Sequence, residues 1–180
     1  TQSVKKLKGH LKKWALAPEG WRLSGSDGRT AYNIEGLDEG ECLDRIYYKN
    51  RWIREKVDVT IDGQTKKVEL EQQLIVTYSI KYRNYLRSIR NRQVERAKKA
   101  VEAGAKTVER KRQNDPRRFI RANHATKEGE AAEHTAYYID EDAIAQEEKY
   151  DGFYAVCTSL EDGAEPIIKV NQRRWEIEEC

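Results

Sequence analysis

Three side chains near the end of the sequence, Asn171, Arg174 and Glu178, have the types and the spacing to act together on one helix face. Gaps of three and four residues bring side chains to neighbouring positions on a helix surface. A carboxylate can hold a divalent cation, and a guanidinium can hold phosphate oxygens. The same spacing is also typical of an exposed ion pair between Arg174 and Glu178, which would contribute about 0.2–0.5 kcal/mol. Spacing alone favours the ion pair.

The residues around this trio resemble the signature of an enzyme family. Arg174-Trp175-x-Ile177-Glu178-Glu179 resembles the centre of the Tyr-x2-Arg-x3-Glu-x6-Lys signature. That signature marks a large group of insertion-sequence transposases with a ribonuclease-H-like catalytic domain. Segments 1–7, 114–119 and 151–158 also resemble parts of one branch of the family. The signature Tyr corresponds to Asn171 here, and its Lys would follow Glu178 by seven positions, past the last printed residue.

The resemblance implies that Glu178 is the third member of an Asp-Asp-Glu triad that holds Mg²⁺ or Mn²⁺. Two such ions stabilise the attacking and leaving oxygens in phosphoryl transfer, and hard cations prefer carboxylate ligands. The expected reaction is metal-dependent nicking of DNA at transposon ends, followed by strand transfer to a target. We expect both catalytic aspartates to precede this sequence, so the chain alone should be inactive. Asp151 comes too late to be the second one.

The implied role of Arg174 is contact with the DNA backbone near the cleavage point. A guanidinium fork suits a phosphate group. The alternative is that Arg174 pairs with Glu178 and orients it, and both roles are compatible with different steps of one reaction.

A basic block lies in the middle of the sequence. Positions 81–112 hold twelve Lys and Arg against three Glu, a net charge of +9 (12 − 3), although the whole chain carries only +3. Positions 140–180 hold four basic against twelve acidic residues, a net of −8 (4 − 12). A basic face can track a DNA backbone, and the alternative is a solvated helix face. The candidate DNA-binding residues are Arg83, Arg87, Arg90, Arg92, Arg96, Lys98 and Lys99.

Trp52, flanked by Arg51 and Arg54, is a further DNA-binding candidate. The resemblance suggests an aromatic residue pushed into DNA near a flipped base, and apolar wedges of this kind are a general strategy. The alternative, a tryptophan that closes one face of a sheet, is favoured by the residue type alone.

Composition excludes several other classes of protein. Three cysteines without a CxxC pair indicate neither a disulfide framework nor a zinc site. The three histidines have no ligand spacing, and the sequence has no Gly-rich phosphate loop, nucleophile elbow or His-Glu-x-x-His run. No apolar run approaches the roughly 18 residues of a membrane span. These features fit a reducing cytoplasm and no membrane. The resemblance further implies a bacterial protein that acts on double-stranded DNA as an oligomer on paired DNA ends.

The hydrophobic pattern predicts an α+β chain. Helical spacing predicts helices over 4–15, 80–103, 141–148 and from Pro166 onward. Ser79 and Asp140 are expected as N-caps, and Gly104 is expected to end the second helix. Alternation and turn residues predict strands over 21–24, 30–34, 45–48, 57–61, 67–70, 74–78, 118–122 and 134–139, with a hairpin at Asp62-Gly63 and a turn at Glu128-Gly129. The almost continuously apolar run 151–159 predicts a strand covered on both faces.

We expect these elements to form three regions. Residues 1–20 form a leading amphipathic helix, and residues 21–139 form a β-rich insertion that includes the long basic helix. Residues 140–180 then supply the last strand and the Glu-bearing helix of the ribonuclease-H-like core. The absence of methionine, and the helical patterns at both ends, suggest an internal fragment of a longer protein. The rival hypothesis is a non-catalytic nucleic-acid-binding module or a decayed transposase remnant.

Overall fold

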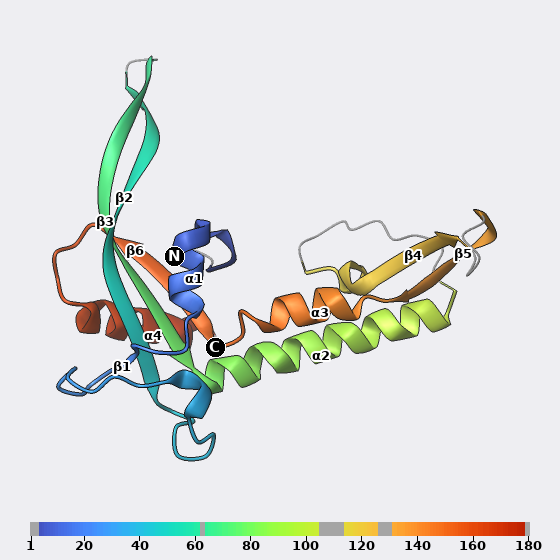
Figure 1. Cartoon of the computed structure of the whole chain (residues 1–180), viewed down its shortest axis with the longest axis horizontal. Helices are drawn as coiled ribbons and strands as arrows, with labels where there is room; N and C mark the ends of the chain where they lie inside the picture. Colours follow the sequence, from blue (N-terminus) through green and yellow to red (C-terminus); the bar gives the residue numbers. More distant parts are fainter. Residues whose placement is uncertain (1–3, 62–63, 105–113, 126–130, 179–180) are drawn as a thin grey trace. The chain divides into compact units, whose positions relative to one another are not determined.

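A computed structural model describes the backbone of residues 4–61, 64–104, 114–125 and 131–178, and the side chains of 4–60, 64–104, 114–123 and 135–172. The chain is a mixture of helices and antiparallel strands (Figure 1), which confirms the α+β class. It divides into unit 1, residues 1–83 with 152–180, and unit 2, residues 84–151. The helices are α1 (Gly9–Leu16), α2 (Ile80–Glu102), α3 (Glu141–Glu148) and α4 (Ala164–Glu178), with short 3-10 helices at Val4–Lys6, Ile34–Gly36 and Pro116–Phe119; the strands are β1 (Arg22–Leu23), β2 (Ile46–Ile61), β3 (Gln64–Ser79), β4 (Ile120–Ala125), β5 (Ala131–Ile139) and β6 (Phe153–Thr158).

Unit 1 is built on a long hairpin in a sheet of order β1-β2-β3-β6. β2 and β3 pair along all sixteen residues of each strand, from Ile46 opposite Ser79 to Ile61 opposite Gln64. The prediction that each was two short strands is wrong, because the charged residues between the apolar runs keep the period-2 alternation and simply face outward. The pairing on both sides of the predicted Asp62-Gly63 turn is as expected, and those two residues lie outside the described part of the chain.

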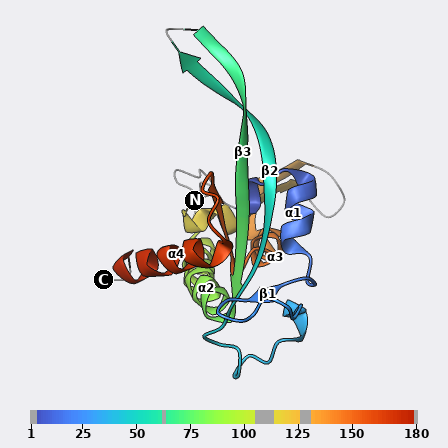
Figure 2. The same ribbon diagram turned by 90° about the vertical axis from the view of Figure 1, so that its left-hand side faces the viewer.

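One helix covers each face of this sheet, at the end of the hairpin far from its turn. Because side chains alternate between the faces of a strand, Tyr48 and Ile75 lie on one face, where they pack with Ile168 of α4. Tyr47 and Tyr78 lie on the other face, on the side of α1, where the ring of Tyr78 packs near Trp21 and that of Tyr47 near Tyr32. Figure 2 shows α4 and α1 on opposite sides of β2 and β3. Unit 1 therefore has a helix–sheet–helix arrangement.

Two strand predictions in unit 1 need correction. β6 pairs only with β3, at the edge of the sheet, and Ala155 is its one buried residue. The expectation of a strand covered on both faces is wrong because an edge position leaves the apolar side chains half-buried. The predicted strand 30–34 is an isolated bridge between Tyr32 and Trp21. A 3-10 helix then begins at Ile34, since the side chain of Asn33 accepts a hydrogen bond from the backbone N–H of Glu35.

The predicted ends of α2 and α3 are confirmed. Ser79 Oγ accepts a hydrogen bond from the backbone N–H of Tyr82 (3.2 Å) at the start of α2, and Gly104, at φ +73°, follows its end. Asp140 accepts from the N–H of Ala143 (3.0 Å) at the start of α3. The first predicted helix is divided into a 3-10 turn and α1, and α4 begins two residues before Pro166.

Unit 2 has its own small core. Val94 and Ala97 of α2 pack with Phe119 and Ile120, which lie where the 3-10 helix Pro116–Phe119 leads into β4. Tyr85, which lies earlier in α2, is 45% exposed. β4 begins at Ile120, two residues later than predicted, because Asp115 caps the 3-10 turn before it. The predicted Glu128-Gly129 turn lies outside the described residues. Among the helices of the described ranges, none is long and apolar enough to cross a membrane.

Candidate functional site

Helix α4 carries the predicted chemical trio. Its backbone is one continuous helix from Ala164 to Glu178, so positions 171, 174 and 178 all lie within it. Ile167 and Ile168 are buried and fix the first half of α4 against the sheet. The side-chain amide of Asn171 donates to the carbonyl of Ile167 within the helix (3.1 Å). Gln172 is the last residue of α4 whose side chain is described, so the side chains of Arg174 and Glu178 lie outside the described set.

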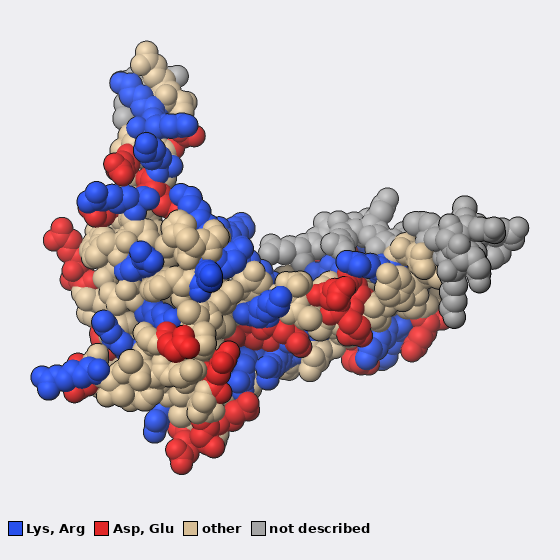
Figure 3. Space-filling model, in the orientation of Figure 1, with Lys and Arg blue, Asp and Glu red and all other residues tan. Residues whose placement is uncertain are grey.

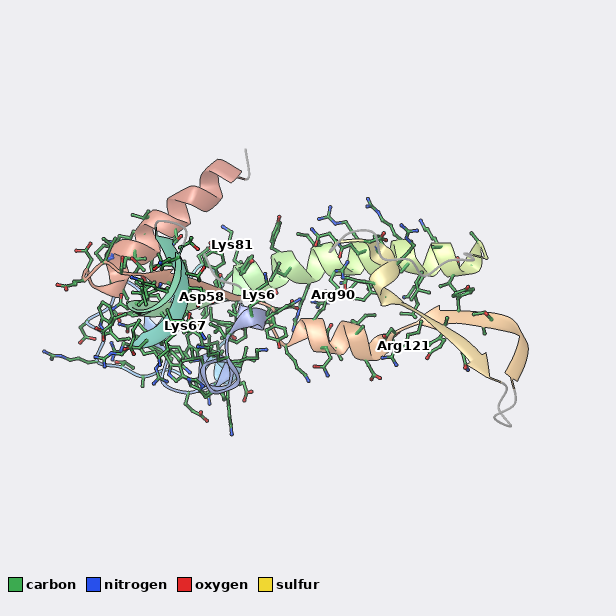
Figure 4. All side chains as sticks on the ribbon, turned by 90° about the horizontal axis from the view of Figure 1, so that it is seen from above. Lys6, Asp58, Lys67, Lys81, Arg90 and Arg121 are labelled. Atoms are coloured by element: carbon green, nitrogen blue, oxygen red, sulfur yellow. The ribbon has the colours of Figure 1, made fainter. Side chains whose placement is uncertain are left out.

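The predicted DNA contact Arg90 is a buried residue of unit 2. Only 5% of its side chain is exposed, and its two terminal nitrogens donate to the two carboxylate oxygens of Asp151, at 2.7 Å each. Glu148 also accepts from Arg90, at 3.1 Å. In Figure 4, Arg90 lies between α2 and α3. Burial acts to lower the pKa of Arg90, but the hydrogen bonds and charge of Asp151 outweigh it and raise that pKa.

Arg83 and Arg87 are also engaged within the chain. Arg83 lies in unit 1, is mostly buried, and forms an ion pair with Glu39 at 2.6 Å. Arg87 is half-exposed and lies 3.6 Å from a carboxylate oxygen of Asp151. Its cation therefore adds to that of Arg90 at one buried carboxylate. The sequence pattern did not reveal these carboxylates, which come from distant positions in the chain.

The remaining predicted cations of α2 are exposed. Among the described residues, Lys98 forms an ion pair with its helix neighbour Glu95, at 3.2 Å, where both side chains are about half-exposed. An exposed pair of this kind contributes little and leaves the ammonium accessible. The four exposed cations lie in unit 2 within two and a half turns of helix, and they are Arg92, Arg96, Lys98 and Lys99. This set, hereafter the α2 cations, is what the structure leaves available for a polyanion.

Trp52 is an exposed residue of β2, with 45% of its surface accessible. It lines a shallow groove of about 400 Å³ together with Lys8, His10 and Arg51. Glu55 and Glu71 lie in the same lining, so the groove carries both signs of charge. Arg51 stacks over the ring of Trp14, with 5.4 Å between its guanidinium carbon and the ring centroid. An accessible indole beside cations can stack on an aromatic base, whereas the alternative of a sheet-closing tryptophan requires burial.

A buried ammonium at Lys49 was not predicted from the sequence. Its Nζ donates to the carbonyl of Ala17 at 2.7 Å, beyond the C-terminus of α1, and lies 4.6 Å from the centroid of the Trp21 ring. Burial lowers the pKa of Lys49 to about 8, against a smaller opposing effect of Glu19. Lys49 thus ties the end of α1 to β2. A lone lysine in an alternating strand gives no signal of this role in the sequence.

Metal-ligating residues do not gather in the part of the chain whose side chains are described. In that part, no group of three His, Cys, Asp or Glu could hold a metal ion. The described acidic residues of positions 140–165 are instead divided among helix caps, ion pairs and exposed positions. Asp140, for example, caps α3 and pairs with Arg121 at 2.7 Å.

No protein-family model, curated protein or solved structure matches this chain. The functional interpretation therefore depends on the residues and on the geometry described above.

Proposed function

We propose that the chain is part of a metal-dependent DNA transposase with a ribonuclease-H-like core, in which Glu178 is one of the metal-binding carboxylates. The observation that carries this proposal is the order of elements around the motif. Strand β6 is followed by helix α4, and α4 continues without a break through the positions of Arg174 and Glu178. The buried residues in the first half of α4 give the helix the rigid support from which a functional carboxylate can be presented.

The α2 cations support a DNA partner for the same protein. They stand on a helix that is anchored by Arg90, Val94 and Ala97 on its packed side, so their own side chains are directed elsewhere on its surface. Phosphate contacts by exposed Arg and Lys supply affinity without sequence preference. Under this proposal, the α2 cations contact the phosphate backbone of the DNA, and DNA nicking takes place at α4.

The metal site of the proposed reaction is not complete in the described residues. A single carboxylate binds Mg²⁺ weakly, because the ion needs several oxygen ligands in a near-octahedral arrangement. The proposal therefore assigns the two aspartates to sequence that precedes this chain in the intact protein. Manganese would fit the same oxygen ligands.

The experiment is a nicking assay with the intact protein on DNA that carries its transposon ends. Glu178→Gln should abolish metal-dependent nicking and leave end binding close to that of the unchanged protein. Glu176→Gln makes the same chemical change two positions earlier in α4, and it is the matched control. Nicking by the Glu178→Gln variant at a rate near that of the control would refute the catalytic role of Glu178.

A second candidate is a nucleic-acid-binding module without catalysis, and the exposed α2 cations favour it independently of α4. It predicts salt-dependent DNA binding and no difference between the Glu178→Gln and Glu176→Gln variants. The nicking assay therefore separates the two candidates.

A further inference from the structure

The outer half of the β2–β3 hairpin is an exposed two-stranded ribbon. This segment, hereafter the arm, consists of residues 54–60 of β2 and 65–71 of β3, which pair directly. Most of its residues are exposed, whereas Ile53, Leu74 and Ile75 nearer the base are buried. In Figures 1 and 2 the arm extends beyond the rest of unit 1. Isolated hairpins are only marginally stable in water, so further interactions must stabilise a ribbon of this length.

One face of the arm is a ladder of opposite charges. Arg54 lies opposite Glu71 with 3.2 Å between their charged atoms. The next pairs on this face are Lys56 opposite Glu69 and Asp58 opposite Lys67; Figure 4 labels the last pair, and Figure 3 shows both signs of charge on the arm. Three cations and three anions give this face no net charge. Cross-strand pairs of opposite charge stabilise the ribbon, and a neutral ladder has no preference for a polyanion.

The other face of the arm is apolar. It carries Glu55 opposite Leu70, Val57 opposite Val68, and Val59 opposite Lys66. Val59 is 36% exposed and Val68 is 43% exposed. This stripe continues the face that α1 covers near the base of the hairpin. Along the arm, Val57 and Leu70 are partly buried, and Val59 and Val68 nearer the tip are exposed. Aliphatic side chains placed together on a projecting ribbon mark a protein contact rather than a DNA contact.

The charges at the two ends of this apolar stripe are complementary. Glu55 lies at the end nearer the base, and Lys66 lies at the end nearer the tip, level with Val59. The two ends are four residues apart, or roughly 13 Å along the strand. If two arms meet face to face and run in opposite directions, Lys66 of each copy comes opposite Glu55 of the other. Glu55 already pairs with Lys8 at 3.3 Å, and its carboxylate can accept from a second cation.

We propose that the arm is a self-association surface, on which two copies of this chain pack their apolar stripes together in antiparallel fashion. A two-fold contact of this kind uses the same patch on both copies. The accessible parts of the four aliphatic side chains, Val57, Val59, Val68 and Leu70, fall well below the roughly 800 Å² that each partner contributes to a stable complex. The contact is therefore weak by itself, and it strengthens where another ligand holds two copies together. This inference is independent of the proposed catalytic role.

Cysteine cross-linking of the whole chain tests the proposal directly. Val57→Cys places a thiol at the middle of the stripe, and Asp58→Cys places one at the next residue on the ladder face. The unsubstituted chain shows the background from its own cysteines, of which Cys42 is buried. Under mild oxidation the Val57→Cys chain should form covalent dimers in a concentration-dependent manner, and the Asp58→Cys chain should stay at background. Circular dichroism confirms that each variant is folded.

Charge exchange tests the antiparallel direction. Lys66→Glu in the Val57→Cys background should lower the cross-linked fraction by roughly threefold or more, because the two-fold symmetry disrupts two pairs at once. Glu55→Lys added to Lys66→Glu should restore it. Equal cross-linking from positions 57 and 58, background yield from both, or a yield that ignores the charge exchange would overturn the proposal.

Discussion

Replacing Asp151 with Asn should strongly destabilise unit 2. The carboxylate of Asp151 is 5% exposed and receives both terminal nitrogens of Arg90 at 2.7 Å. The amide has the same shape, but it cannot balance the buried guanidinium. Removing one partner of a buried ion pair typically costs about 3–5 kcal/mol. We expect the lower end of that range, because Glu148 remains 3.1 Å from Arg90 and is half-exposed to water.

Hydrogen exchange of the backbone amides of α3 and of residues 84–102 of α2 is the suitable assay, because it reports on unit 2 alone. A loss of about 3 kcal/mol corresponds to exchange that is faster by roughly two orders of magnitude. Glu95→Gln is the matched control, since it breaks the exposed pair with Lys98 and should change exchange by less than about 0.5 kcal/mol.

The double variant Arg90→Met with Asp151→Leu completes the test. Two apolar side chains of similar size remove both buried charges, so most of the lost stability should return. The reasoning fails if Asp151→Asn behaves like the Glu95→Gln control. It also fails if the double variant is less stable than the single one, because the penalty would then come from packing and not from an unbalanced charge.

Three further predictions concern DNA binding, pH dependence and packing. The combined variant Arg92→Glu, Arg96→Glu and Lys99→Glu should weaken binding of double-stranded DNA. The slope of log binding constant against log salt concentration should become shallower by about 0.9 for each lost phosphate contact. An unchanged slope in fluorescence anisotropy titrations would assign these residues to a solvated face. Because burial lowers the pKa of Lys49 from 10.5 to about 8, the folded chain loses this proton at lower pH than the unfolded chain, so stability from Lys49 should rise between those values. Urea unfolding of Lys49→Met should lack this rise, and identical pH profiles for the two chains would contradict the assignment. Gly152→Ala should destabilise unit 1 by about 2–3 kcal/mol, because φ is +84° and a Cβ would lie 2.8 Å from the Tyr78 ring. Thermal unfolding measures this loss. The control Gly25→Ala, at φ +81° with open space around it, should lower the free energy of unfolding by only about 1 kcal/mol, and equal losses of stability in the two variants would refute the steric argument.

Local signals in the sequence predicted the helices well. Ser79 and Asp140 are caps whose side chains reach the first turn of their own helix, so neighbouring residues contain the whole interaction. The end of α2 at Gly104 is equally local. Strand lengths were less accurate, because charged residues such as Arg54 and Glu71 look like interruptions until the cross-strand partner is known.

The candidate site was only partly predictable for the same reason. Seven basic residues of α2 looked equivalent in the sequence, but Arg90 is buried against Asp151, which lies 61 positions later in the chain. Lys49 and its carbonyl partner Ala17 are also brought together only by the fold. Long-range pairing therefore decided which cations remain available, whereas helix spacing alone could place positions 171, 174 and 178 in one helix.

The most direct test of the proposed function is the nicking activity of the intact protein with Glu178→Gln beside Glu176→Gln. The proposal predicts that the first variant binds transposon-end DNA but does not nick it in Mg²⁺ or Mn²⁺, while the second nicks at close to the original rate. Near-equal nicking by both variants would contradict the catalytic assignment and leave the chain as a DNA-binding module.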